Sequence, residues 1–164
     1  MTATPAPPGY TVVDSPLGEI VVAGGPDAVT AVWFAPPSDR EGWERDDAGL
    51  APVARRLEEY FAGRGRDLDV PVRVEGSPFE RRVWQEVRAI PYGRTASYAE
   101  IARRIGRPGA ARAVGRANAR NPVCLVVPCH RVVGTDGGLT GYSGGLERKR
   151  ALLALEGGEG LATG

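Results

Sequence analysis

Short runs in which apolar and polar residues alternate dominate the first part of the chain. Residues 10–14, 19–23 and 28–34 form three such runs, separated by turns rich in glycine and proline. This spacing predicts a small antiparallel sheet. The polar, turn-rich residues 35–49 are expected to form a loop.

Helical periodicity replaces alternation after that loop. Apolar residues recur at helical spacing over residues 50–61, and Gly63 is expected to end the helix. Residues 68–74 alternate again and predict a further strand. The pattern therefore predicts an α+β module, preceded by a disordered lead at residues 1–9.

Capping sequences predict where helices begin in the second half of the chain. Ser77 and Glu80 form a capping box before one amphipathic helix, and Ser97 and Glu100 form another before a short helix. Residues 146–155 predict a closing helix, with Leu146 and Leu153 among its inward residues.

The overall pattern predicts fold class α+β, with two domains in one chain of 164 residues. A sheet-containing N-terminal domain is expected over residues 10–74. A mostly helical C-terminal domain is expected over residues 77–157, followed by a frayed tail at residues 158–164.

Two short helices joined by a glycine-containing turn, at residues 98–105 and 109–118, are the pattern of a helix-turn-helix. The second is built of Ala and Gly around Arg112 and Arg116, and small residues let a helix approach a surface closely. The alternative is a small-residue helix packed inside the protein.

The apolar residues 123–127 predict a strand that delivers Cys129 to the turn at its end. Cys129 directly precedes His130, the only histidine of the chain, so a thiol beside an imidazole is a candidate nucleophile. Cys124 is interpreted as a small apolar residue of the same strand, too close to Cys129 for a disulfide bond. One histidine and two cysteines do not supply a zinc site, and no metal is expected.

The charges of the two halves differ in sign. Residues 1–70 carry six Arg against twelve acidic residues, net −6, whereas residues 79–120 carry ten Arg against three Glu, net +7. A basic segment of this kind indicates either a nucleic-acid partner or a solvated arginine-rich surface. The chain shows no secretory signal or membrane-length apolar run, so we expect a cytoplasmic protein in a reducing setting.

Several motifs, in one order and spacing, resemble the O6-alkylguanine-DNA alkyltransferase family of DNA-repair proteins. The resemblance is strong over residues 77–157 and weaker over the N-terminal module. The motifs are Pro128-Cys129-His130-Arg131-Val132, Ile90-Pro91-Tyr92-Gly93, Ser97-Tyr98, Ala110-Ala111-Arg112-Ala113-Val114-Gly115, Asn121-Pro122, Gly141-Tyr142-Ser143-Gly144-Gly145 and Leu152-Leu153-Ala154-Leu155-Glu156.

The resemblance implies one irreversible transfer of an alkyl group from O6-alkylguanine, and more weakly from O4-alkylthymine, to Cys129. The alkyl carbon must be attacked by a thiolate, so Cys129 needs a depressed pKa. The resemblance implies that His130 reaches the thiol through a water and that Glu156 holds the imidazole. It also implies that Asn121 ties the turn at Cys129 to the helix-turn-helix and that Tyr98 helps guanine to leave. Structural alternatives are a helix-ending Asn121, a packing Tyr98 and a Glu156 that merely ends a helix.

The resemblance further implies minor-groove binding of duplex DNA, with the damaged nucleotide turned out of the stack and Arg112 filling the gap. The expected DNA-binding residues are Ser97, Ala111, Arg112, Ala113, Gly115, Arg116 and Asn118. The expected alkyl-base pocket is lined by Tyr98, Val132, Tyr142, Ser143 and Gly144, the last three on a loop whose alternative role is a flexible surface segment.

No cofactor, membrane or protein partner is implied, and the protein is expected to be monomeric, with cooperative binding to DNA left open. Asn118 and Thr140-Gly141 depart from the family pattern, which bears on the range of alkyl groups accepted. Two other function classes remain: a cysteine hydrolase using Cys129, His130 and Glu156, and a DNA-binding module without catalysis.

Overall fold

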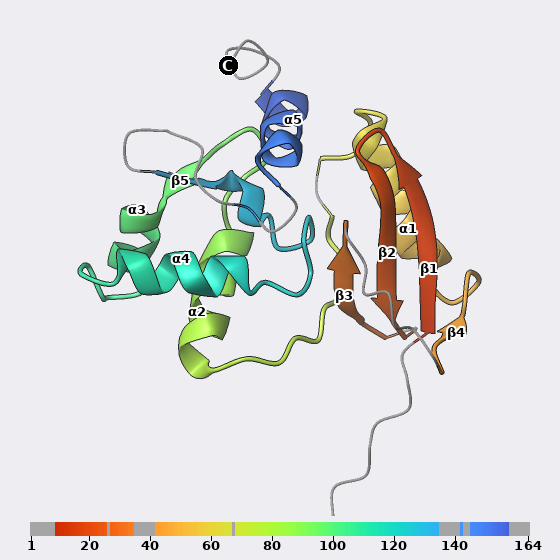
Figure 1. The fold of residues 1–164 in the computed structure, drawn as a ribbon, viewed down its shortest axis with the longest axis horizontal. Coiled ribbons are helices and arrows are strands. Elements are labelled where there is room, and N and C mark those ends of the chain that lie inside the picture. Colours follow the sequence, from red (N-terminus) through yellow and green to blue (C-terminus); the bar gives the residue numbers. More distant parts are fainter. Residues whose placement is uncertain are drawn as a thin grey trace, which may run out of the picture.

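The computed structural model describes residues 9–25, 27–34, 42–66, 68–134, 142 and 145–157. The predicted lead up to residue 8 and the predicted tail lie outside these ranges, as do residues 35–41 of the expected loop and residues 135–141, 143 and 144 of the glycine-rich loop. Figure 1 shows a sheet-containing part and a mostly helical part side by side, which confirms the α+β class.

The N-terminal sheet has the strand order β3-β2-β1-β4 among the described residues. Strands β1 (Gly9–Ser15), β2 (Gly18–Gly24) and β3 (Val29–Trp33) pair antiparallel, as the alternation predicted. The two-residue strand β4 (Glu44–Arg45) adds parallel to β1. It lies where only a loop was expected, because two exposed polar residues carry no alternation signal.

The sheet is covered on both faces. Ile20 to Ala23 of β2 are consecutive and fully buried, and consecutive strand residues point to opposite faces. Helix α1 (Ala51–Phe61) packs against β1 and buries Val53, Leu57 and Tyr60, which confirms the predicted helix. Tyr60 lies near the end of α1, and its side chain is only 1% exposed.

The predicted strand at residues 68–74 is not formed. The segment makes a single bridge, Val29 with Val72, in which Val29 N–H donates to Pro71 and Arg73 N–H donates to Val29. Pro71 has no N–H to continue a ladder, so the segment stays extended beside β3 without joining the sheet. Leu68 and Val70, two of the alternating apolar residues, are nevertheless buried.

The C-terminal part is helical, as predicted. Ser77 and Ser97 form complete capping boxes at α2 and α3, and α3 and α4 pack together through a turn at Gly106. Figure 1 shows α2, α3 and α4 on the side away from the sheet. The helices are α2 (Pro78–Arg88), α3 (Tyr98–Arg104), α4 (Ala111–Ala119) and α5 (Leu146–Gly157).

The segment before Cys129 corrects the sequence prediction. Residues 123–127 form turns and isolated bridges, and Leu125 has a left-handed φ of 76°, which no regular strand contains. Cys129 begins a 3₁₀ turn, η1 (Cys129–Arg131), that leads into β6 (Val132–Val133). Strand β6 pairs parallel with β5 (Ala96–Ser97), which places the thiol turn next to the start of α3.

One buried cluster joins the two parts of the molecule. It runs from Val13 of β1 through Tyr60 of α1 to Leu152 of α5. Leu146 was expected to point inward but is 45% exposed, whereas Leu153 is buried as predicted. Among the described residues, no helix is long and apolar enough to span a bilayer.

Candidate active site

The backbone around Cys129 is fixed by two asparagine side chains. Asn118 Nδ2 donates to the Cys129 carbonyl at 3.1 Å, and Asn121 Nδ2 donates to the Val127 carbonyl at 2.8 Å. The Oδ1 atom of Asn121 also accepts from Val123 N–H at 3.0 Å. The thiol-bearing turn is therefore tied directly to the end of α4.

Asn118 was predicted to contact DNA, and in this structure its side chain is directed to the Cys129 backbone. Its side chain lies on the inner face of α4 and is 5% exposed. A helix whose outward residues reach a nucleic acid must turn another face to its own core, and Asn118 belongs to that inner face with Val114 and Ala117. The tie that was expected of Asn121 alone is shared by both asparagines.

The Cys129 thiol is buried, with 2% of the residue exposed. A hydrogen bond with the Cys124 thiol, together with burial, raises the pKa of Cys129 above its ordinary value, while the side chains of Asn121 and Tyr142 oppose this rise. The expectation of a depressed pKa is therefore wrong for the protein as it stands in this structure.

His130 and Glu156 form a buried pair. His130 Nε2 lies 2.8 Å from Glu156 Oε2. Burial favours the neutral acid of Glu156, but hydrogen bonds from His130 and Arg131 outweigh this and hold its pKa at about 2. Burial lowers the pKa of His130, against the opposing effect of Glu156.

These charge states assign the tautomer of His130. An ionised Glu156 only accepts hydrogen bonds, so the neutral imidazole of His130 places its proton on Nε2. The lone pair is then on Nδ1, and this buried atom has no hydrogen-bond partner among the described residues. The unpaired Nδ1 is the basic atom of the site.

Arg131 and Tyr60 complete the surroundings of Glu156 and were not predicted as site residues. Arg131 donates from Nε to Oε1 at 2.7 Å and from Nη2 to Oε2 at 2.9 Å, and from Nη1 to the Ile90 carbonyl. The Tyr60 hydroxyl donates to Oε2 at 2.5 Å. An arginine directly after the Cys129-His130 pair was a signal for Arg131. The sequence pattern around Tyr60 indicated only a buried residue of a helix.

Lys149 is a further residue that the sequence analysis missed. It is fully buried on the inner face of α5, and its Nζ lies 6.0 Å from the centroid of the Tyr98 ring. Burial lowers its pKa to about 8, while the nearby Cys129 acts in the opposite direction. The available signal was spacing, because Lys149 and Glu156 stand seven residues apart and share one helix face with Leu152 and Leu153.

The helix-turn-helix residues divide between inward and outward positions. Arg112 and Arg116 are exposed on α4, where a partner can reach them. Gly115 faces Tyr98, since a Cβ atom at position 115 would lie 3.7 Å from the Tyr98 ring. Ala111 and Ala113 are half-buried.

The remaining predicted residues line the neighbourhood of the thiol turn. Ser97 is buried, and its hydroxyl caps α3 by accepting from Glu100 N–H at 3.0 Å. Val132 is fully buried in β6. Tyr142 is half-buried and lies close enough to Cys129 to affect its pKa. Ser143 and Gly144 lie outside the described residues.

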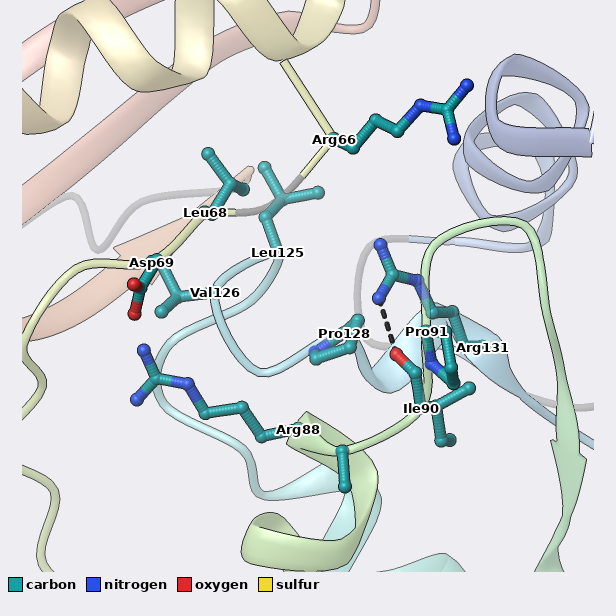
Figure 2. A pocket seen from close by; sticks show the side chains of 11 residues that line it. Arg66, Leu68, Asp69, Arg88, Ile90, Pro91, Leu125, Val126, Pro128 and Arg131 are labelled. Atoms are coloured by element: carbon teal, nitrogen blue, oxygen red, sulfur yellow. Dashed lines mark hydrogen bonds between the residues drawn. The ribbon is translucent and has the colours of Figure 1, made fainter.

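A cavity of about 330 Å³ lies between the segment after α1 and the end of α2, and Pro128 and Arg131 of the thiol turn line it. Figure 2 shows Arg66, Arg88 and Arg131 around it, with Arg131 bonded to the Ile90 carbonyl. Cys129 does not line this cavity, so it is not the predicted alkyl-base pocket. Among the described residues, no group of three or more His, Cys, Asp or Glu side chains forms a metal site.

Both parts of the chain match family models. Residues 9–74 match the model of the 6-O-methylguanine DNA methyltransferase ribonuclease-like domain, and residues 78–158 match that of the 6-O-methylguanine DNA methyltransferase DNA binding domain.

Similar proteins match over most of this chain and most of their own length. A methylated-DNA–protein-cysteine methyltransferase of Mycolicibacterium paratuberculosis is 49% identical over 150 residues, which cover 90% of this chain and 91% of the relative. The constitutive enzyme of that name from Bacillus subtilis is 41% identical over 156 residues, covering 90% and 94%. The crystal structure of Mycobacterium tuberculosis OGT in complex with DNA superposes with a TM-score of 0.86 at 46% identity, covering 92% of this chain and 93% of that one.

Proposed function

Because the chain belongs to the 6-O-methylguanine DNA methyltransferase family, we propose that it repairs DNA by direct transfer of the alkyl group of O6-alkylguanine to Cys129. The observation that carries this proposal is the buried Cys129 thiol, followed in the same turn by His130, whose Nε2 lies 2.8 Å from Glu156 Oε2. O4-alkylthymine is a weaker substrate, and the cytoplasm is the proposed location.

The reaction is a displacement at carbon. The bond between the alkyl carbon and the guanine oxygen breaks, and a bond between that carbon and Cys129 Sγ forms. The thiol proton passes to His130 Nδ1 through one bridging water, and Glu156 stabilises the resulting imidazolium. The thioether is stable, so each molecule reacts once and needs no cofactor.

The raised pKa of Cys129 gives this reaction a specific order. The Cys124 thiol and burial disfavour the thiolate, so the thiol is proposed to lose its proton only when the substrate occupies the site. The lysine ammonium of Lys149 lies near Cys129 and Tyr98, and its charge favours the thiolate once the proton leaves. The Tyr98 hydroxyl assists the departing guanine by a hydrogen bond to a ring nitrogen.

DNA is the proposed partner, bound as a duplex through its minor groove by the α3–α4 unit. Arg112 and Arg116 are exposed on α4, within the segment of net charge +7 between residues 79 and 120. A buried thiol cannot meet a base inside a duplex, so the nucleotide is turned out and Arg112 enters the gap. Asn118 serves this site from inside by holding Cys129. The protein acts as a monomer.

Intact-mass measurement tests the proposed function. Incubation with duplex DNA that carries O6-methylguanine is expected to add the mass of one methylene group to each protein molecule and then stop. Peptide mapping should place the group on Cys129, and Cys129→Ser should take up none. Repeated turnover, or no adduct on the wild-type protein, contradicts the proposal.

The role of Arg112 is tested by comparing two substrates. Arg112→Ala is expected to slow repair of O6-methylguanine in a duplex by at least about 10-fold, while reaction with free O6-benzylguanine changes little, since the free base needs no flipping. Arg55→Ala removes the same charge from an exposed position on α1 and serves as the control. Equal losses on both substrates would rule out the gap-filling role.

A further inference from the structure

Tyr60 of the N-terminal domain forms a hydrogen bond with Glu156, the partner of His130. It lies in α1, 96 residues before Glu156, yet its hydroxyl donates to Glu156 Oε2 at 2.5 Å. The ring is 1% exposed and packs edge-on against Phe61 and Tyr92. The hydroxyl is therefore aimed at the carboxylate by a rigid core.

Tyr60 and His130 share one oxygen atom. Glu156 Oε2 accepts from the Tyr60 hydroxyl, from His130 Nε2 at 2.8 Å and from Arg131 Nη2 at 2.9 Å, whereas Oε1 accepts from Arg131 Nε. A carboxylate oxygen that accepts several donors carries less negative charge for each of them. The Tyr60 hydroxyl thus weakens the pull of Glu156 on the imidazole proton.

We propose that Tyr60 is a positioning residue of the alkyl-acceptor site, through which the N-terminal domain sets the basicity of His130 by sharing Glu156 Oε2. The inference rests on the proposed alkyl transfer to Cys129. It assigns the N-terminal domain a part in the chemistry, in addition to its part in the common core.

The direction of the effect follows from the groups that face His130. Glu156 and Lys149 face it from α5, Arg131 from its own turn, and Cys129 precedes it; Tyr60 from α1 and Tyr92 stand behind Glu156. Glu156 favours the protonated imidazole, whereas burial, Arg131 and Lys149 disfavour it. Removing the Tyr60 hydroxyl leaves His130 and Arg131 as the donors to Oε2. Glu156 then favours the protonated imidazole more strongly, so the pKa of His130 rises.

NMR titration of Tyr60→Phe measures this directly. His130 is the only histidine, so the ring signals of untagged, histidine-labelled protein report this residue alone. The pKa of His130 is expected to rise in Tyr60→Phe. The matched control is Tyr92→Phe, which removes a hydroxyl that donates to the Leu155 carbonyl at 3.3 Å and should leave the pKa of His130 unchanged.

A change of opposite sign strengthens the test. Site-specific 3-fluorotyrosine at position 60 retains the ring and has a more acidic hydroxyl, which donates more strongly, so the pKa of His130 is expected to fall. Equal pKa values in the wild-type protein and both Tyr60 variants would overturn the inference, whatever happens to the melting temperature. A change of melting temperature without a change of pKa would give Tyr60 a purely structural role.

Single-turnover kinetics then connect the titration to repair. The pH at which methyl transfer falls off on the acid side is expected to move upward in Tyr60→Phe, with one methyl group still accepted per protein. If methyl transfer falls off at the same pH in Tyr60→Phe as in the wild-type protein, the inference would also be overturned. If the wild-type protein accepts no methyl group, the proposed function fails, and the NMR titration still decides whether Tyr60 controls His130.

Discussion

At the scale of single residues, the surroundings of Cys129, the proposed nucleophile, favour its protonated thiol. The Cys124 thiol and burial raise the pKa of Cys129, and the side chains of Asn121 and Tyr142 only partly oppose them. A protonated thiol is a poor target for oxidants and stray electrophiles. A protein that reacts once gains from this, because each premature reaction would consume a molecule.

Cys124→Ala tests this view. The substitution removes the largest cause of the raised pKa, so the pKa of Cys129 is expected to fall and its thiolate to appear at lower pH. Thiolate absorbance near 240 nm, followed against pH, measures the change. Cys124→Ala combined with Cys129→Ser gives the baseline. A Cys129 titration unchanged by the loss of Cys124 would show that burial alone holds the proton.

At the scale of elements, the two capping boxes have the same chemistry and different surroundings. Ser77 accepts from Glu80 N–H at the exposed start of α2, whereas Ser97 accepts from Glu100 N–H at the buried start of α3. Helix α3 begins with Tyr98, and β5 beside it pairs with β6. The second box therefore fixes the strand that follows the thiol turn as well as its own helix.

Ser77→Ala and Ser97→Ala form a matched pair. Each is expected to lower the free energy of unfolding by about 1 kcal/mol, since each leaves one helix N–H without its cap. Only Ser97→Ala is expected to slow methyl transfer, by shifting Tyr98. Urea denaturation and single-turnover kinetics measure the two effects, and an equal slowing by both variants would show that lost stability, rather than position, is responsible.

At the scale of the whole molecule, Glu156 connects elements that are far apart in the sequence. It accepts hydrogen bonds from Tyr60 in α1 and from His130 and Arg131 in η1, while belonging to α5. Its pKa of about 2 lies below the ordinary value of 4.5. The ionised form therefore stabilises the fold, and this stabilisation is present above about pH 4.5 and is lost as the pH falls toward 2.

Glu156→Gln measures that contribution. At neutral pH the variant is expected to be less stable by about 3 kcal/mol, from the pKa difference and the unpaired charge of buried Arg131. The gap between wild type and variant should narrow as the pH falls from 5 to 2. Denaturant unfolding at each pH provides the data, with exposed Glu58→Gln on α1 as the control. A gap that does not depend on pH would contradict the low pKa.

The sequence by itself determined what depends on near neighbours along the chain. Alternation predicted β1 to β3, apolar periodicity predicted α1 and α5, and capping boxes predicted α2 and α3. The segment of small residues after a glycine-containing turn predicted α4, and the adjacent Cys129 and His130 indicated a nucleophile. These signals are local, because a strand or a cap is specified by residues within a few positions of one another. The family resemblance, read from the order of the motifs, also predicted Glu156 as a site residue.

Tertiary structure decided what depends on distant partners. The apolar residues 123–127 form no sheet strand, because Leu125 has a left-handed φ. The alternating residues 68–74 form only an isolated bridge, because Pro71 lacks an N–H. Lys149 and Asn118 are polar residues, which are usually exposed. They are buried because each lies on the inner face of its helix, α5 for Lys149 and α4 for Asn118. Tyr60 meets Glu156 across 96 residues, and only the packing of α1 against the C-terminal part brings them together.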